Sequence, residues 1–219
     1  MDVVTQTRMR REQGRDLPVL VWRFATPVRV IASAPHGGGI GVRRWAVNAQ
    51  VPGSYARRDP DRHLAQLGVA LGLAGRGVGM LTAADVRRCT SGFDGGVEVT
   101  ATVGLGHPIR AAAADDPRPV EPVGTINLVV LVPELLTDAA LVNAVATATE
   151  AKSQALADLG LEATGTASDA VCILCPGDGP RALFGGPRSV WGSRIARAVH
   201  TAVLDGGRDP RSRSDGADA

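Results

Sequence analysis

Apolar and polar residues alternate along several short stretches of the chain, and this period of two predicts β-strands. The clearest stretch is 97–103, where valine or alanine at odd positions alternates with glutamate or threonine at even positions. Thr100 and Thr102 are therefore expected to face away from the valines, toward solvent or toward a site. Further strands are expected at 18–24, 28–34, 40–51, 79–84, 123–132 and 170–175.

Three other stretches show the helical period. Residues 59–74 begin with a proline at an early helical position and carry leucines three and four apart. Thr137 is expected to N-cap the longest helix, which ends at Gly160. A closing helix is expected at 188–204. The order of strands and helices predicts an α+β fold, with mostly antiparallel or mixed sheet packed with about three helices.

The 219 residues suit one domain, predicted to span residues 17–204. Residues 1–16 and 205–219 are polar and lack periodicity, so disordered tails are expected at both ends. The stretch 107–122 is rich in proline, alanine and aspartate, which is typical of a surface loop.

Composition excludes several classes of function. The 24 basic and 22 acidic residues nearly cancel, and aromatic residues make up only 3%, which argues against a nucleic-acid partner. The chain shows no signal peptide and no long apolar run, so a cytoplasmic protein without a membrane partner is expected. Cys172 and Cys175 have CxxC spacing but fall in a predicted strand, where they face opposite sides. We therefore expect neither a metal site nor a resident cofactor.

Lys152 is the only lysine in the chain, against 23 arginines. It lies in the apolar stripe of the longest predicted helix, four residues after Ala148, so its ammonium group points into the fold. A buried ammonium needs a carboxylate, carbonyl oxygens or a ligand. The alternative is that the side chain extends along the stripe to water.

Two neighbouring features also carry polar groups. Glu150 projects to the opposite side of the same helix, where it is either a buried carboxylate or a solvated surface residue. Residues 164–169 place hydroxyls, a glycine and the carboxylate of Asp169 in one short turn. That turn either binds a polar ligand or closes on its own backbone. No general motif for a catalytic triad is present.

Six segments, in this order, resemble the adenosylcobinamide amidohydrolase family. They are VNAQVP at 47–52, MLTAADV at 80–86, VTATVG at 99–104, GTIN at 124–127, ATATEAK at 146–152, and ATGT at 163–166 with Asp169. The resemblance covers about residues 28–203. It implies a cytoplasmic hydrolase of corrinoid salvage. Such an enzyme cleaves the amide between the aminopropanol arm and the corrin ring, giving adenosylcobyric acid for coenzyme B12 synthesis.

Amide hydrolysis needs a nucleophile or activated water, a proton donor for the leaving amine and donors for the oxyanion. Our hypothesis places three catalytic residues, Lys152, Glu150 and Asp169, around one cleft. Lys152 and Glu150 leave their helix in different directions, so they need not share a site. The predicted substrate-binding residues are Asn48, Thr100, Thr102, Thr125, Asn127, Thr147 and Thr166.

Alternatives remain open for both mechanism and function. Thr125 follows Gly124 and could act as a nucleophile after self-cleavage, because an N-terminal threonine can serve as its own base. The chain could also be a non-catalytic corrinoid-binding protein, although a DxHxxG pattern is absent, or it could hydrolyse a different amide. A homodimer through the small-residue helices is compatible with the sequence.

Overall fold

The computed structural model describes residues 1–114 and 124–213 and is organised around one long strand. This strand, β2 (Arg15–Ala32), pairs with β1 (Val3–Glu12) along its first half and with β11 (Ala170–Cys175) along its second half. On its other edge β2 pairs with β3 (Gly39–Gln50). Three strands thus depend on the extended conformation of β2.

The sheet has eight strands, in the order β4-β3-β2-β11-β8-β6-β5, with β1 paired to β2. The remaining strands of this sheet are β4 (Gly77–Thr82), β5 (Thr90–Asp94), β6 (Val97–Gly104) and β8 (Thr125–Leu131). β3 and β4 pair in parallel, as do β8 and β11, whereas the other pairs are antiparallel. The predicted α+β fold with a mixed sheet is confirmed.

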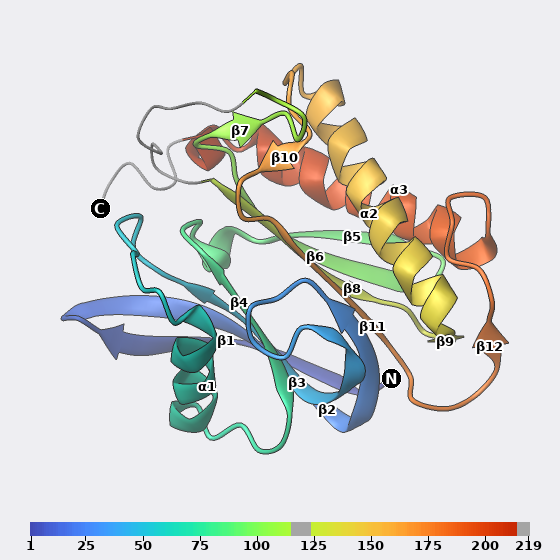
Figure 1. Ribbon diagram of the computed structural model, residues 1–219, viewed down its shortest axis with the longest axis horizontal. Coiled ribbons are helices and arrows are strands. Elements are labelled where there is room, and N and C mark those ends of the chain that lie inside the picture. The colour runs from blue at the N-terminus through green and yellow to red at the C-terminus, as the bar shows by residue number, and fades with distance from the viewer. Residues whose placement is uncertain (115–123, 214–219) are drawn as a thin grey trace.

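Three α-helices cover one face of the sheet (Figure 1). They are α1 (Pro60–Ala70), α2 (Asp138–Asp158) and α3 (Val190–Arg208). α1 packs on β2, β3 and β4 through Leu64 and Leu67, while α2 and α3 lie side by side over β6, β8 and β11. Short elements complete the described chain: η1 (Val86–Arg88), β7 (Pro108–Ile109), β9 (Leu135–Leu136), β10 (Gly165–Thr166), β12 (Arg181–Ala182) and η2 (Pro210–Arg213).

The opposite face of the sheet curls inward and encloses a second apolar core. Trp22, Met80, Val129 and Cys172 are all almost fully buried there. Side chains alternate between the two faces, so Ile173 packs beneath the helices while its neighbour Cys172 points into the inner core. The curl brings β3 and β4 near β6 and β8, although these strands are far apart in the order of the sheet.

The longest helix has the predicted ends. The Thr137 hydroxyl oxygen accepts a hydrogen bond from the amide of Ala140 at 3.2 Å, and Gly160 follows the helix with φ of +74°. A positive φ favours glycine, which explains why the helix stops there. These caps fix the rotation of α2 and, with it, the direction of Lys152.

The predicted disordered tail at residues 1–16 is wrong. β1 pairs with β2 in a regular hairpin, and the turn residues Gln13 and Gly14 both have positive φ. Most side chains of β1 are exposed, so the strand lacks the apolar alternation that predicts strands. Arg8 and Arg10 attach it further, through the carbonyl oxygens of Leu71 and Gln50.

The predicted disordered tail at residues 205–219 is also wrong over its first part. α3 continues to Arg208, because Gly206 and Gly207 pack closely against Val103 and Leu159 where a larger residue would collide. The chain then turns through η2, and the Ser212 carbonyl accepts the amide of Leu105 at 2.6 Å. Residues 214–219 lie outside the described part of the chain.

Two smaller differences concern the connections. The strand β5 was not predicted, because Gly92 interrupts its pattern where it passes the backbone of Ala198 in α3. The predicted loop at 107–122 contains β7, which pairs with β10. Residues 115–122 of that loop fall outside the described part of the chain.

Candidate active site

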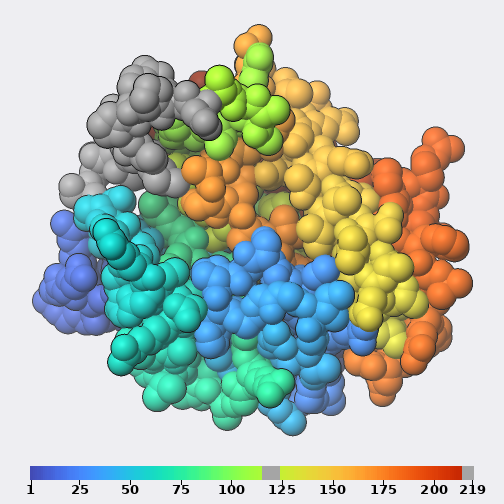
Figure 2. Space-filling view, viewed as in Figure 1, coloured from blue at the N-terminus to red at the C-terminus, as the bar shows by residue number. Residues whose placement is uncertain are grey.

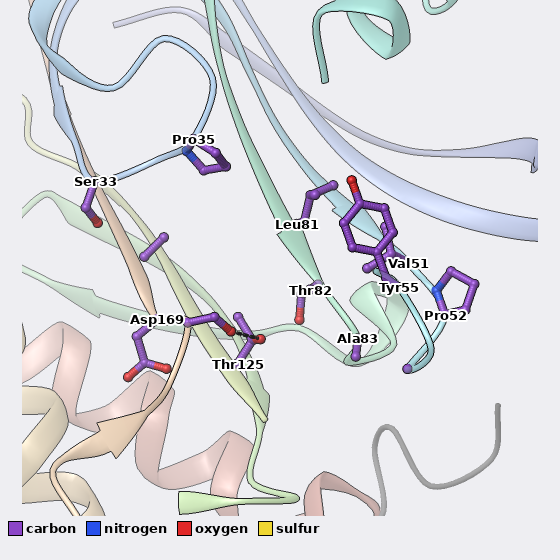
Figure 3. Close-up of a pocket in the computed structure, with 13 residues that line it drawn as sticks. Ser33, Pro35, Val51, Pro52, Tyr55, Leu81, Thr82, Ala83, Thr125 and Asp169 are labelled. Atoms are coloured by element: carbon purple, nitrogen blue, oxygen red, sulfur yellow. Dashed lines mark hydrogen bonds between the residues drawn. The ribbon is translucent and has the colours of Figure 1, made fainter. Parts of the chain in front are cut away.

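A pocket of about 310 Å³ opens where β4 ends and β8 begins. Its wall comes from five segments that are distant in sequence (Figure 3). Figure 2 shows the surface hollowed where the blue, cyan and orange segments meet. The lining residues are Ser33, Pro35, Val51, Pro52, Gly53, Tyr55, Leu81, Thr82, Ala83, Thr125, Ser168, Asp169 and Ala170.

Two hydroxyl groups touch one another at this pocket. The Thr125 Oγ1 and Ser168 Oγ atoms lie 2.8 Å apart, as the dashed line in Figure 3 marks. Ser168 Oγ also donates to the carbonyl oxygen of Gly124 at 3.4 Å. Thr125 is only 5% exposed, because it opens β8 at the inner face of the sheet. Ser168 thus bonds to both the hydroxyl of Thr125 and the peptide carbonyl that precedes it.

The Asp169 carboxylate is held by four donors. Oδ1 accepts the Ile126 amide at 2.8 Å and the Thr166 hydroxyl, while Oδ2 accepts the Thr166 amide at 3.1 Å and the Lys152 ammonium. The backbone donors fix the turn before β11 against the start of β8. The carboxylate is therefore anchored, with both of its oxygens occupied by donors.

Lys152 forms a buried ion pair with Asp169, and the two side chains are 8% and 11% exposed. Lys152 does not line the pocket but lies behind Asp169. Gly165 makes room for the pair, since a Cβ atom there would collide with both charged groups. The lone lysine thus neutralises the carboxylate and ties α2 to the pocket wall.

A second polar cluster closes the curled sheet next to Thr125. Asn127 Nδ2 donates to Asn48 Oδ1 at 2.9 Å and to the Leu81 carbonyl at 2.8 Å, and Asn48 Nδ2 donates to Thr102 Oγ1 at 2.9 Å. These bonds join β3 and β4 to β6 and β8. The buried Asn127 Oδ1 has no hydrogen-bond partner among the described residues.

Seven of the ten predicted site residues fall in these two clusters. Lys152, Asp169, Thr125 and Thr166 meet beside the pocket, and Asn48, Thr102 and Asn127 form the adjoining cluster.

The structure does not bring the other three to the pocket. Glu150 is exposed on the outer side of α2, because that side of the helix is not covered. Thr147 lies on the buried side of α2, where its hydroxyl donates to the Gly185 carbonyl at 2.9 Å. Thr100 pairs with Val129 in the register of the sheet, further along β6 from the pocket than Thr102.

Other residues that complete the wall, above all Tyr55, are not among the predicted site residues. Its hydroxyl bonds His63 Nδ1 at 2.9 Å, and His63 Nε2 lies 3.0 Å from Glu12 Oε1. In Figure 3 the ring borders the pocket while the hydroxyl points away from Thr125. Burial raises the pKa of the Tyr55 phenol. Tyr55 is the only tyrosine of the chain, and that was the one available signal.

Histidines of the described chain do not line the pocket. His36 stacks on Trp45 with ring centroids 5.7 Å apart, and desolvation by burial lowers its pKa. No group of three or more metal-ligating side chains occurs within residues 1–114 and 124–213. In the same two ranges, no helix is both long and apolar enough to cross a membrane.

Comparison with known proteins identifies the class of protein. The chain is 33% identical to the adenosylcobinamide amidohydrolase of Halobacterium salinarum over 194 residues, covering 84% of this chain and 82% of the relative. It is 27% identical to the protein of that name from Methanosarcina mazei over 187 residues, covering 80% and 88% of the two chains. This chain is an amidohydrolase.

The family follows from the same comparison. A sequence profile of adenosylcobinamide amidohydrolases matches residues 1–215, and the chain belongs to that family. Among solved structures, the chain is similar to an L-aminopeptidase D-Ala-esterase/amidase from Ochrobactrum anthropi. The TM-score is 0.38 with 14% identity, over 93% of this chain and 82% of the other. That similarity is too low to bear on the chemistry.

Proposed function

We propose that the chain hydrolyses the amide joining the aminopropanol arm to the corrin ring of adenosylcobinamide, releasing adenosylcobyric acid for coenzyme B12 salvage. Membership of the adenosylcobinamide amidohydrolase family supports hydrolysis of an amide of this substrate. The observation that supports its place is the pair of touching hydroxyls, Thr125 and Ser168, in the wall of a pocket that opens to the surface.

The size of the pocket suits the arm of the substrate and not its ring. Pockets that enclose whole drug-sized ligands span about 300–1,000 Å³, and this one holds about 310 Å³. A corrin ring with its amide side chains exceeds that volume. The arm therefore enters the pocket, and the ring lies across an apolar rim that includes Pro35, Pro52 and Ala83.

Thr125 is the nucleophile in this proposal. Its hydroxyl lies in a nearly dry wall, where Ser168 orients it by a hydrogen bond at 2.8 Å. Attack on the substrate amide gives an ester on Thr125 and releases aminopropanol, and water then hydrolyses the ester. Asp169 and Lys152 position the strand beside Thr125 and take no proton.

Two further hydroxyls are available to the developing oxyanion. Ser33 Oγ accepts the amide of Val171 at 3.1 Å, and Thr82 Oγ1 accepts the amide of Ala84 at 3.1 Å. Because each oxygen already accepts a backbone bond, its O–H is free to donate to the substrate carbonyl. Donors fixed in this way stabilise negative charge in the transition state.

The test is incubation of the full chain with adenosylcobinamide, with mass-spectrometric detection of both products. We expect Thr125→Ala to lower the rate by at least about 100-fold, as losses of catalytic groups commonly do. Thr149→Ala is the matched control, since that hydroxyl is exposed on α2 and bonds only to Val145 of the same helix, at 2.9 Å.

Three results would count against the proposal. Full activity of the Thr125→Ala variant would remove Thr125 from the mechanism. Binding of the corrinoid without formation of either product would indicate a non-catalytic corrinoid-binding protein. Hydrolysis of other amides in preference to adenosylcobinamide would change the substrate.

A further inference from the structure

Among the residues that the structure describes, no general base contacts the proposed nucleophile in the uncut chain. Thr125 Oγ1 bonds to Ser168, and the other bond of Ser168 runs to the Gly124 carbonyl, so neither contact removes a proton. Asp169 already accepts four donors. The only lysine is held by Asp169.

Histidines do not fill this gap. His36 stacks on Trp45, His63 bonds Tyr55 and Glu12, and His200 bonds Asp158 at 2.7 Å. His107 is exposed and outside the pocket lining. Over the described chain, then, no free base contacts the pair of hydroxyls.

We propose that the chain cleaves its own backbone between Gly124 and Thr125, and that the amine released on Thr125 is the missing base. The geometry that carries this is the double contact of Ser168, which bonds both the Thr125 hydroxyl and the carbonyl oxygen of Gly124. One side chain thus connects the attacking group to the bond under attack. The role of the released amine as a base rests on the proposed amide hydrolysis, whereas the self-cleavage does not depend on it.

The chemistry of the cleavage balances with water as the only co-reactant. Thr125 Oγ1 attacks the carbonyl carbon of Gly124, and an O–C bond forms. The C–N bond then breaks, and the proton of the hydroxyl passes through Ser168 to the departing nitrogen of Thr125. Water hydrolyses the resulting ester, giving a carboxylate on Gly124 and restoring the Thr125 hydroxyl beside its free amine.

The backbone on both sides of this bond is held in place. A Cβ atom at Gly124 would lie 2.6 Å from the Gly104 carbonyl oxygen, so only glycine fits this close approach. On the other side, the Ile126 amide donates to Asp169 at 2.8 Å. Lys152 secures that carboxylate from behind. The ion pair therefore acts as a positioning device for the cleaved bond.

The chain contains a second bond of the same type as an internal comparison. Gly165 precedes Thr166, but the Thr166 hydroxyl donates to the carboxylate of Asp169. That hydroxyl is committed to an acceptor that does not contact the preceding carbonyl. We expect cleavage at Thr125 and none at Thr166.

The amine would have suitable chemistry for the reaction that follows. An α-amino group has an ordinary pKa of about 7.7–8.0, so a substantial fraction is neutral near neutral pH. It lies on the same residue as the hydroxyl and can take that proton directly. Free rotation is limited, because β8 remains paired on both sides after the cut.

The test is the intact mass of the purified full-length chain after denaturation, followed over time. Cleavage gives two fragments, residues 1–124 and 125–219. Periodate cleaves the 1,2-amino alcohol that a serine or threonine presents only at a free N-terminus, so the second fragment, with its cysteines alkylated beforehand, should lose mass on periodate treatment. We expect Thr125→Ala to stay uncut, Thr125→Ser to cleave, and Ser168→Ala to cleave at least about 10-fold more slowly. The Thr149→Ala control should cleave as the wild type does.

The outcomes separate the two proposals. An uncut wild-type chain that hydrolyses adenosylcobinamide would overturn self-cleavage and leave the proposed function standing. A chain that cleaves at Thr125 but releases no aminopropanol would support self-cleavage and contradict the proposed function. Cleavage of the Thr125→Ala variant, or cleavage at Thr166 instead, would also overturn the inference.

Discussion

Lys152 and Asp169 form a buried ion pair behind the pocket rather than inside it. The ammonium group reaches from α2 to the turn before β11, and the same carboxylate binds the amides of Ile126 and Thr166. In the proposed mechanism, a pair placed in this way positions Thr125 without touching the substrate. Both residues therefore have a positioning role in that mechanism, exerted through the backbone amides of Ile126 and Thr166.

Replacing Lys152 by methionine should destabilise the fold. Asp169 would then be a buried charge without its counterion, and such losses cost about 3–5 kcal/mol. We expect a lower free energy of unfolding in urea and a lower kcat, with KM changing less because the substrate arm contacts other residues. Lys152→Arg should also be impaired, because Gly165 leaves little room around the ammonium group.

The double variant Lys152→Met with Asp169→Asn provides the control for this prediction. Removing both charges leaves no uncompensated carboxylate. The double variant should therefore lose less free energy of unfolding than the two single variants lose together. Strict additivity of the two effects would show that the ion pair does not couple α2 to the turn.

The cluster of Asn48, Asn127 and Thr102 should contribute to stability in the same region. Asn48→Ala removes the acceptor of one Asn127 bond and the donor to Thr102, at a cost of about 1–3 kcal/mol for groups left buried and unsatisfied. The measurement is the free energy of unfolding. Thr100→Val is the matched control, because Thr100 lies on the same face of β6 as Thr102 and its side chain forms no hydrogen bond within the described chain. An equal loss in both variants would contradict the role of the cluster.

The sequence was sufficient to predict elements whose signals are local. The N-cap at Thr137 and the glycine at 160 gave the ends of α2, and the apolar stripe gave the inward direction of Lys152. β1 was missed because an edge strand exposed to solvent carries no apolar alternation. The end of α3 was missed because Gly206 and Gly207 are typical of a helix end unless close packing requires them.

The site depended on contacts between elements, which periodicity does not specify. Asp169 was expected to belong to a polar turn, but its pairing with Lys152 depends on how α2 packs against β11. Likewise, the bond between Asn48 and Asn127 exists because the sheet curls until β3 approaches β8. All four residues were candidates from the sequence, whereas their pairing followed only from the fold.

Glu150 should be dispensable, contrary to the hypothesis from sequence. Its carboxylate is exposed on the outer side of α2, and the helix itself separates it from the pocket. Glu150→Gln should leave product formation from adenosylcobinamide unchanged. It should change the free energy of unfolding by no more than about 0.5 kcal/mol. A large loss of activity with retained folding would mean that substrate contacts this face of α2.

Cys172 should make stability depend on pH in alkaline solution. Complete burial in the inner core raises the pKa of its thiol from 9.0 to about 12. Between these values the unfolded chain loses the thiol proton while the folded chain keeps it, so the free energy of unfolding falls as pH rises above about 9. Below that pH both states are protonated and the thiol adds no pH dependence.

Other groups titrate in this range too, so the measurement is the difference in free energy of unfolding between the wild type and Cys172→Ala. The cost of the cavity in that variant does not change with pH. We expect the advantage of the wild type to shrink from about pH 8 to about pH 10.5. A constant difference over that interval would show that the thiol is not shielded from water.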